Sequence, residues 1–180
     1  MIMAKRASPE HGRRAVMIIA FEMFRDEEYA EPKAVLKKAG FKITTASSKL
    51  GEATGRFGLK ANIDLTLDQV KVEDYDAVLF IGGPGSHGYY QDPTAHRIAQ
   101  EAVKQEKLLG AICAAPGILA HAGVLKGKRA TVHEGDIDAL KQGGAIYTGK
   151  GVEIDGKIIT ATGPSTAKAW GEAIVKTLKL

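Results

Sequence analysis

The chain has 180 residues, of which 44% are hydrophobic and 26% are charged, and its formal net charge is +4. This length suits one compact domain and is short for two, and the composition is that of a soluble globular protein. Charges of both signs are interspersed and no apolar run approaches the roughly 20 residues that span a bilayer, so we expect neither a nucleic-acid nor a membrane partner.

Much of the positive charge lies near the N-terminus. We predict a disordered basic leader over residues 1–13, followed by a single domain over residues 14–180. No signal-type apolar segment comes before the first predicted strand, which argues against secretion. The single cysteine cannot form an internal disulfide and so fits a reducing compartment. We therefore expect a cytoplasmic protein.

Short apolar runs alternate with helical patterns in the first half of the chain. The run over 15–20 is continuous, as in a parallel strand that is buried on both faces. A helical pattern follows and ends at Gly40, a residue typical of helix C-termini. After the first strand we predict a helix over 26–39, a strand over 41–46, a hairpin or other excursion marked by glycines over 51–63, and a short strand over 64–67.

The same alternation continues in the second half. A third buried strand over 76–81 ends at a glycine-rich run, and Pro93 suits the first turn of the next helix. From there we predict a helix over 93–105, a strand over 107–112, a helix over 113–122 and a strand over 128–132. A short helix over 136–141, a hairpin around Asp155-Gly156 over 152–160 and a final helix over 165–178 follow. This pattern predicts an open, mostly parallel α/β sheet with helices on both faces and a small hairpin addition.

The single cysteine, Cys113, lies where a buried strand is predicted to end and a helix to begin. An apolar run precedes it, and Ala-Ala-Pro-Gly follows it. This pattern is typical of a nucleophile elbow, a sharp turn that exposes a reactive side chain above the first N–H groups of a helix. Because those N–H groups favour negative charge, we expect the thiol to ionise more readily than in water. A buried structural cysteine is the alternative.

Three acids, Asp26, Glu27 and Glu28, begin the first predicted helix. Acids are favoured at a helix N-terminus whatever the function. One of them would nevertheless lie above the carboxyl edge of the sheet, within reach of Cys113. The pKa of an acid beside a thiolate is raised, so such a group would hold a proton and could pass it on.

Two further segments are predicted at the same edge. The run Gly82–Gly85 would bring backbone N–H groups to a developing oxyanion, together with the N–H of Ala114. His133 ends the strand after the elbow helix and is a candidate proton carrier, with a surface or core histidine as the alternative. The five histidines are scattered and there is one cysteine, so no metal site is predicted.

Four motifs together resemble the DJ-one/ThiJ/PfpI superfamily. They are Glu28 followed by Pro32, the Gly-Gly pair after the third strand, Ile-Cys-Ala-Ala-Pro over 112–116, and His133. The resemblance runs from about Ala15 to the C-terminus and implies a flavodoxin-like sheet related to class I glutamine amidotransferases. The chain is more similar to the DJ-one/ThiJ branch, because alanine follows the cysteine where the PfpI protease-like branch has histidine.

The resemblance implies a nucleophile, Cys113, with an essential acid, Glu28, and a histidine, His133. It also implies oxyanion or substrate contacts from Gly82, Gly83 and Ala114. Two positions depart from the pattern. Arg25 stands where many members have a second acid, and it would anchor an anionic substrate or stabilise the thiolate. Glu134 stands where proline is common, and it would alter the rim of the pocket.

The resemblance also implies a function. The leading hypothesis is a homodimeric, cofactor-independent enzyme that acts on small reactive dicarbonyls, converting methylglyoxal to lactate without glutathione or removing early glycation adducts. One alternative is a redox sensor or stress-response chaperone with an oxidisable cysteine. Another is an intracellular cysteine peptidase similar to the PfpI branch, which is disfavoured by the alanine at position 114.

Overall fold

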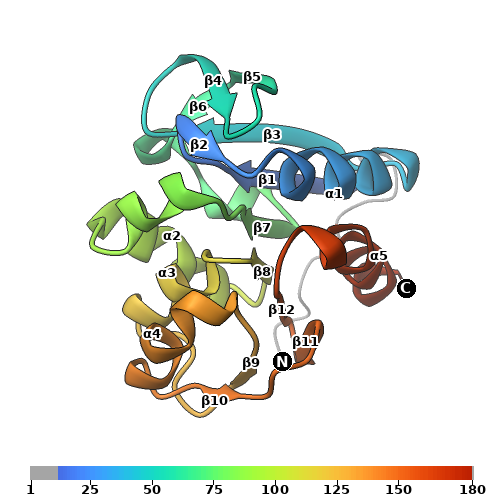
Figure 1. Ribbon diagram of the computed structural model, residues 1–180. Coiled ribbons are helices and arrows are strands. Elements are labelled where there is room, and N and C mark those ends of the chain that lie inside the picture. The colour runs from blue at the N-terminus through green and yellow to red at the C-terminus, as the bar shows by residue number, and fades with distance from the viewer. Residues whose placement is uncertain (1–11, 180) are drawn as a thin grey trace.

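The computed structural model describes residues 12–179, which form a seven-stranded sheet covered by helices on both faces (Figure 1). The strand order is β11-β12-β8-β7-β1-β3-β6. All neighbours pair in parallel except β11 and β12, which are antiparallel, so the predicted mostly parallel sheet is confirmed. The strands are β1 (Arg14–Ile18), β3 (Lys42–Ser47), β6 (Leu65–Thr66), β7 (Ala77–Phe80), β8 (Leu108–Ile112), β11 (Val152–Asp155) and β12 (Ile158–Ala161).

Five helices cover the two faces of the sheet. One face carries α1 (Asp26–Lys38) and α5 (Ala167–Leu178), and the other carries α2 (Pro93–Lys104), α3 (Pro116–His121) and α4 (Ile137–Gln142). Strand β1 contributes side chains to both cores, which explains why its apolar run is continuous. None of these helices, within the part of the chain that is described, is long and apolar enough to cross a membrane.

Two smaller sheets are attached to this framework. One is β2 (Glu22–Phe24), β4 (Gly51–Gly55) and β5 (Lys60–Ile63), and the other is β9 (Arg129–Ala130) with β10 (Ile146–Tyr147). The predicted hairpins are confirmed as the antiparallel pairs β4–β5 and β11–β12. Strands β2 and β10 have three and two residues and were not predicted, because such short segments carry no periodic pattern.

The predicted leader lies outside the described residues except for its last two positions. The Arg13 guanidinium donates to the Leu178 carbonyl at 2.7 Å. Its own carbonyl accepts from the Lys42 N–H at 2.8 Å, beside the first pair of β1 and β3, which is Arg14 with Lys42. Arg13, the last residue of the predicted leader, is therefore held by the fold.

The carboxyl ends of β1, β7 and β8 lie side by side, because these three strands are parallel neighbours. The segment Gly82–Gly85 follows β7 at this edge, and Cys113 follows β8. Such edges are where ligands bind in open α/β sheets. The topology therefore gathers the predicted site residues at one rim.

The Trp170 side chain on α5 provides a test of the core. It is fully buried, and its indole N–H donates to the Ile159 carbonyl at 3.0 Å. We expect Trp170→Ala to lower the free energy of unfolding by about 3–5 kcal/mol in urea denaturation, because a cavity replaces the ring. The matched control is Ile154→Ala on the outer strand β11, which is 44% exposed and should cost less than about 1 kcal/mol. Equal losses for the two variants would contradict this assignment of the core.

Candidate functional site

Cys113 occupies a strained turn between β8 and α3. Its φ is 64°, in the left-handed region that non-glycine residues rarely adopt. The residue is fixed on both sides, since its N–H donates to the Ala161 carbonyl at 2.9 Å and its carbonyl accepts from the His133 N–H at 2.8 Å. A strand, a sharp turn and a helix follow one another here, as the nucleophile-elbow prediction requires.

The Glu28 carboxyl lies against the thiol of Cys113. Its side chain is fully buried, and neither carboxyl oxygen has a partner of good hydrogen-bond geometry among the described residues. Gly82 leaves the space in which the two groups meet. A Cβ at position 82 would lie 2.6 Å from the Cys113 Cβ and 2.6 Å from Glu28 Oε1. The absence of that carbon brings acid and thiol together.

Burial controls the acidity of both groups. It raises the pKa of Glu28 to about 7, while the nearby thiol, Arg25 and the Gly82 N–H favour the carboxylate. The pKa of Cys113 is raised to about 12, mainly by burial and to a lesser extent by the charge of Glu28. The expectation of a readily ionised thiol is therefore wrong, because burial and a neighbouring carboxylate outweigh the favourable N–H groups. The expectation of a raised pKa for the acid is confirmed, but the main cause is burial.

Backbone N–H groups surround the sulfur. Those of Gly83 and Ala114 lie close enough to favour the thiolate. Gly83 has a φ of 107°, and a Cβ there would overlap the backbone nitrogen of Arg25. The turn after β7 therefore needs glycine at both positions, 82 for the Glu28–Cys113 contact and 83 for its own backbone. Two N–H groups aimed at one sulfur can also stabilise negative charge on an oxygen bound next to it.

Arg25 joins the site from the N-terminus of α1. Its backbone N–H donates to the Gly82 carbonyl at 2.9 Å, and its Nε donates to Glu27 at 2.7 Å. The bond to Glu27 raises the pKa of the guanidinium, and the charges of Glu28 and Cys113 add to this effect. The structure thus places a cation near the acid and the thiol. Glu134 lies further out, on an exposed turn.

His133 reaches the same edge through its backbone. Its side chain is half exposed, and its Nδ1 accepts from the Gly135 N–H at 3.2 Å and lies 3.7 Å from Asp136 Oδ2. The contacts recorded for this imidazole are therefore to its own turn. The structure brings Cys113, Glu28, Gly82, Gly83, Ala114 and Arg25 together, while the His133 ring lies at the rim.

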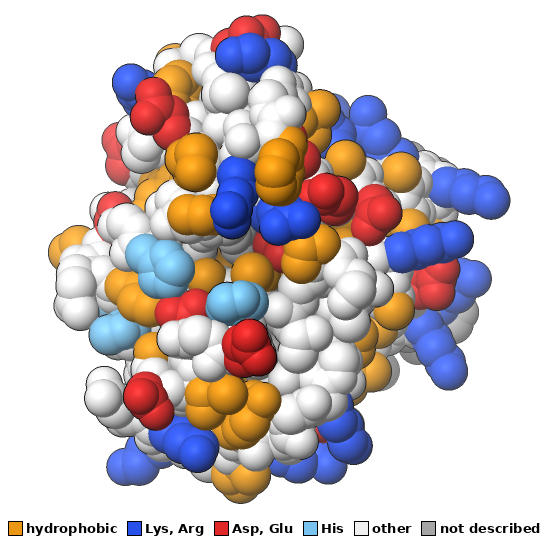
Figure 2. Space-filling view, in the orientation of Figure 1, with side chains coloured by type: hydrophobic (Ala, Val, Ile, Leu, Met, Phe, Trp, Pro, Cys, Tyr) orange, Lys and Arg blue, Asp and Glu red, His pale blue; other side chains and the backbone are white. Residues whose placement is uncertain are grey.

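Two residues near the site, Tyr90 and Asp136, were not predicted from the sequence. The Tyr90 hydroxyl donates to the Ala114 carbonyl at 2.7 Å, and burial, followed by the charges of Asp136 and Cys113, raises the pKa of that phenol. Asp136 Oδ1 lies 2.9 Å from His87 Nε2, so it links the turn after β7 to the turn that holds His133. Figure 2 shows histidines gathered on one face with acidic side chains among them. The rings at 87, 89 and 90, directly after the glycine run, were the available sequence signal.

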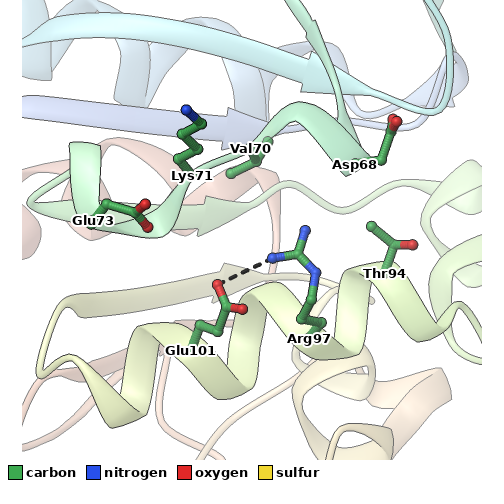
Figure 3. Close-up of a pocket in the computed structure, with 7 residues that line it drawn as sticks. All are labelled: Asp68, Val70, Lys71, Glu73, Thr94, Arg97 and Glu101. Atoms are coloured by element: carbon green, nitrogen blue, oxygen red, sulfur yellow. Dashed lines mark hydrogen bonds and ion pairs between the residues drawn. The ribbon is translucent and has the colours of Figure 1, made fainter.

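The surface also has a cavity that lies away from this cluster. It has a volume of about 370 Å³, lies between α2 and the segment before β7, and contains none of the site residues (Figure 3). Its walls are mostly charged, and Arg97 and Glu101, one turn apart on α2, form an ion pair at 3.1 Å along one wall. Within residues 12–179, no group of three or more histidine, cysteine or acidic side chains has an arrangement that could hold a metal ion.

Comparison with known proteins gives consistent matches. A sequence model of the DJ-1/PfpI family matches residues 13–177. An uncharacterised protein of Methanocaldococcus jannaschii is 39% identical over 169 residues, which are 92% of this chain and 82% of the relative. A deglycase of Pyrococcus abyssi is 32% identical over 164 residues (91% and 99%), and a glutathione-independent glyoxalase of Caenorhabditis elegans is 29% identical over 167 residues (93% and 89%). The crystal structure of a ThiJ/PfpI domain protein from Brachyspira murdochii matches with a TM-score of 0.89 and 30% identity, covering 92% of this chain and 95% of that chain, which confirms the predicted fold.

The buried acid should make stability depend on pH. The pKa of Glu28 rises from an ordinary 4.5 to about 7 in the folded protein, so folding favours its protonated form. The contribution of Glu28 to the free energy of unfolding should therefore be greatest below about pH 4.5. It should fall by on the order of 3 kcal/mol as the pH rises to about 7. We expect Glu28→Gln to be more stable than the parent in urea at about pH 8, and Glu31→Gln, on the exposed side of the same helix, to match the parent. A less stable Glu28→Gln at that pH would contradict the prediction.

The same contact should control the reactivity of the thiol. Because the charge of Glu28 raises the pKa of Cys113, Glu28→Gln should lower it. Alkylation by iodoacetamide, followed by intact mass, should then begin at a lower pH in Glu28→Gln than in the parent. Glu31→Gln serves again as the control. An unchanged onset of alkylation would show that the two groups are not coupled.

Proposed function

Because the chain belongs to the DJ-1/PfpI family, we propose that it is a cysteine-dependent enzyme that converts reactive dicarbonyls into hydroxy acids without glutathione or a cofactor. The relatives named deglycase and glutathione-independent glyoxalase support this class of activity. The observation that carries the proposal is the buried Glu28 carboxyl beside Cys113, with a pKa of about 7. An acid with that pKa can both accept and donate a proton near neutral pH.

The first step is addition of the thiol to the aldehyde carbon of methylglyoxal. A bond forms between Sγ of Cys113 and that carbon, and the electron pair of the C=O bond moves to oxygen. The oxygen then takes up the proton that the thiol has given up, which yields a neutral hemithioacetal. The N–H groups of Gly83 and Ala114 would stabilise the oxyanion while it exists. Because they act on developing charge, the thiol needs no low pKa before the substrate arrives.

The second step moves one proton between neighbouring carbons. The Glu28 carboxylate removes a proton from the former aldehyde carbon, and the electrons form a C=C bond to the former ketone carbon, whose oxygen takes the negative charge of an enediolate. The hydroxyl proton of the first carbon then passes to that oxygen, and Glu28 returns its proton to the second carbon, which leaves a lactoyl thioester on Cys113. The carboxylate is restored, so no oxidant or reductant is needed. Its burial keeps water from exchanging the proton during transfer.

The third step is hydrolysis of the thioester. Water attacks the acyl carbon, the C–S bond breaks, and lactate leaves while the thiol regains a proton. His133 is the group at the rim that would accept a proton from the water, and Asp136, 3.7 Å from its Nδ1, would stabilise the imidazolium. In the deglycase form of the reaction, the thiol would displace the amine of a protein or nucleotide from the carbinolamine carbon of a glyoxal or methylglyoxal adduct. The C–N bond breaks, the amine leaves with the thiol proton, and the same hemithioacetal then undergoes the second and third steps.

Two other functions have less support. A redox sensor works best with an exposed thiolate, whereas Cys113 is partly buried and burial raises its pKa. A peptidase of the PfpI branch would have a histidine directly after the nucleophile, where this chain has Ala114. Assays of lactate formation, of oxidation by peroxide and of casein cleavage separate these functions from dicarbonyl conversion.

We expect the purified protein to form lactate from methylglyoxal in the absence of glutathione. Cys113→Ala and Glu28→Gln should each lower kcat by at least about 100-fold, because each removes a group that the chemistry requires. Lactate is measured enzymatically and by NMR, with Glu31→Gln as the matched control that keeps full activity.

Three results would contradict the proposal. One is no lactate from the parent protein. Another is a mass gain of two oxygens with mild peroxide that depends on Cys113 while lactate is absent, which favours the sensor. The last is cleavage of casein that is lost in Cys113→Ser, which favours the peptidase.

A further inference from the structure

Two guanidinium groups lie around one exposed aromatic ring next to the site. Phe57 is 64% exposed, and the guanidinium carbons of Arg25 and Arg56 lie 4.9 Å and 5.5 Å from its ring centroid. Both are cation–π distances. Figure 2 shows two basic side chains side by side in the middle of the face that also carries the histidines. Two guanidinium groups therefore stand at the rim of the site on the side of α1.

The three acids of the first turn of α1 differ in how directly they compete for the Arg25 guanidinium. Asp26 is occupied elsewhere, since it accepts from the backbone N–H groups of Phe57 and Leu59 at 3.0 Å and 2.8 Å. Glu28 is buried and, with a pKa of about 7, carries only part of a charge near neutral pH. Glu27 remains as the direct ion-pair partner, and its recorded bond uses only the Nε of Arg25.

Arg25 is also tied to the loop that faces the thiol. Its backbone N–H donates to the Gly82 carbonyl at 2.9 Å, and the charges of Cys113 and Glu28 both act on its guanidinium. The Arg25 side chain is 26% exposed, so it is open to a ligand but partly shielded from water. The N–H groups at the end of a guanidinium form a fork that fits a carboxylate.

We propose that the preferred substrate is an oxoaldehyde with a carboxylate at the far end of its carbon chain, and that Arg25 binds this carboxylate. The inference rests on the proposed function and names the substrate class of the same site. The chemistry is unchanged: the aldehyde carbon bonds to Cys113, Glu28 moves one proton, and water releases a hydroxy acid. Dioxovalerate would give hydroxyglutarate, with the distant carboxylate untouched.

The experiment compares two oxoaldehydes of equal chain length. Dioxovalerate carries the carboxylate, and propylglyoxal has a methyl group in its place. We expect kcat/KM to be higher for dioxovalerate, and Arg25→Gln to reduce the ratio of the two kcat/KM values by about tenfold, the lower end for a hydrogen bond to a charged group. Arg25→Lys should retain part of the preference. Glu27→Gln should increase the ratio, because it removes the carboxylate that competes for Arg25.

A second measurement does not depend on turnover. Glutarate should slow the alkylation of Cys113 by iodoacetamide in the parent protein and much less in Arg25→Gln, while the neutral diamide of glutarate should protect in neither. An unchanged ratio in Arg25→Gln, or a parent protein that prefers propylglyoxal, would overturn the inference while leaving dicarbonyl conversion intact. If no oxoaldehyde is converted but glutarate protects through Arg25, the proposed reaction fails and the anion site stands.

Discussion

The structure of the site depends on one contact, in which a fully buried carboxyl group meets a partly buried thiol. In water the carboxyl would be ionised at neutral pH, but burial and mutual repulsion make negative charge on it unfavourable here and doubly so if the thiol also ionises. The pair therefore keeps a proton that solvent would otherwise remove. The surrounding elements serve this contact: α1 delivers the acid, β8 delivers the sulfur, and the turn after β7 leaves the gap between them.

The arrangement of these reactive groups lowers the stability of the folded protein. A fully buried acid without a good hydrogen-bond partner is unfavourable, and so is a non-glycine residue with a φ of 64°. The remainder of the fold offsets both costs with two apolar cores on either side of a parallel sheet. Unsatisfied polar groups persist in folded proteins mainly where they have a function, so their meeting at one edge supports a reactive centre there.

Much of the fold could be predicted from the sequence, because buried parallel strands are continuous apolar runs and their ends carry glycines. The elbow at Cys113 was predictable for the same reason. The acidity of the thiol was not, since it depends on how deeply the sulfur is buried and on which acid of α1 turns inward. Tyr90 and Asp136 were missed because their roles come from contacts between segments that lie far apart in the sequence. A single sequence contains no periodic signal for such contacts.

The gap at position 82 also limits how this chain can change over time. Every amino acid other than glycine carries a Cβ, and that single carbon would fall between the two reacting groups. Any substitution of Gly82 would therefore disturb the contact between Glu28 and Cys113, whereas the surfaces of the surrounding helices can vary widely. Laboratory evolution toward other substrates would have to proceed through the rim, at positions such as 25 and 56, and leave the glycines at 82 and 83 untouched.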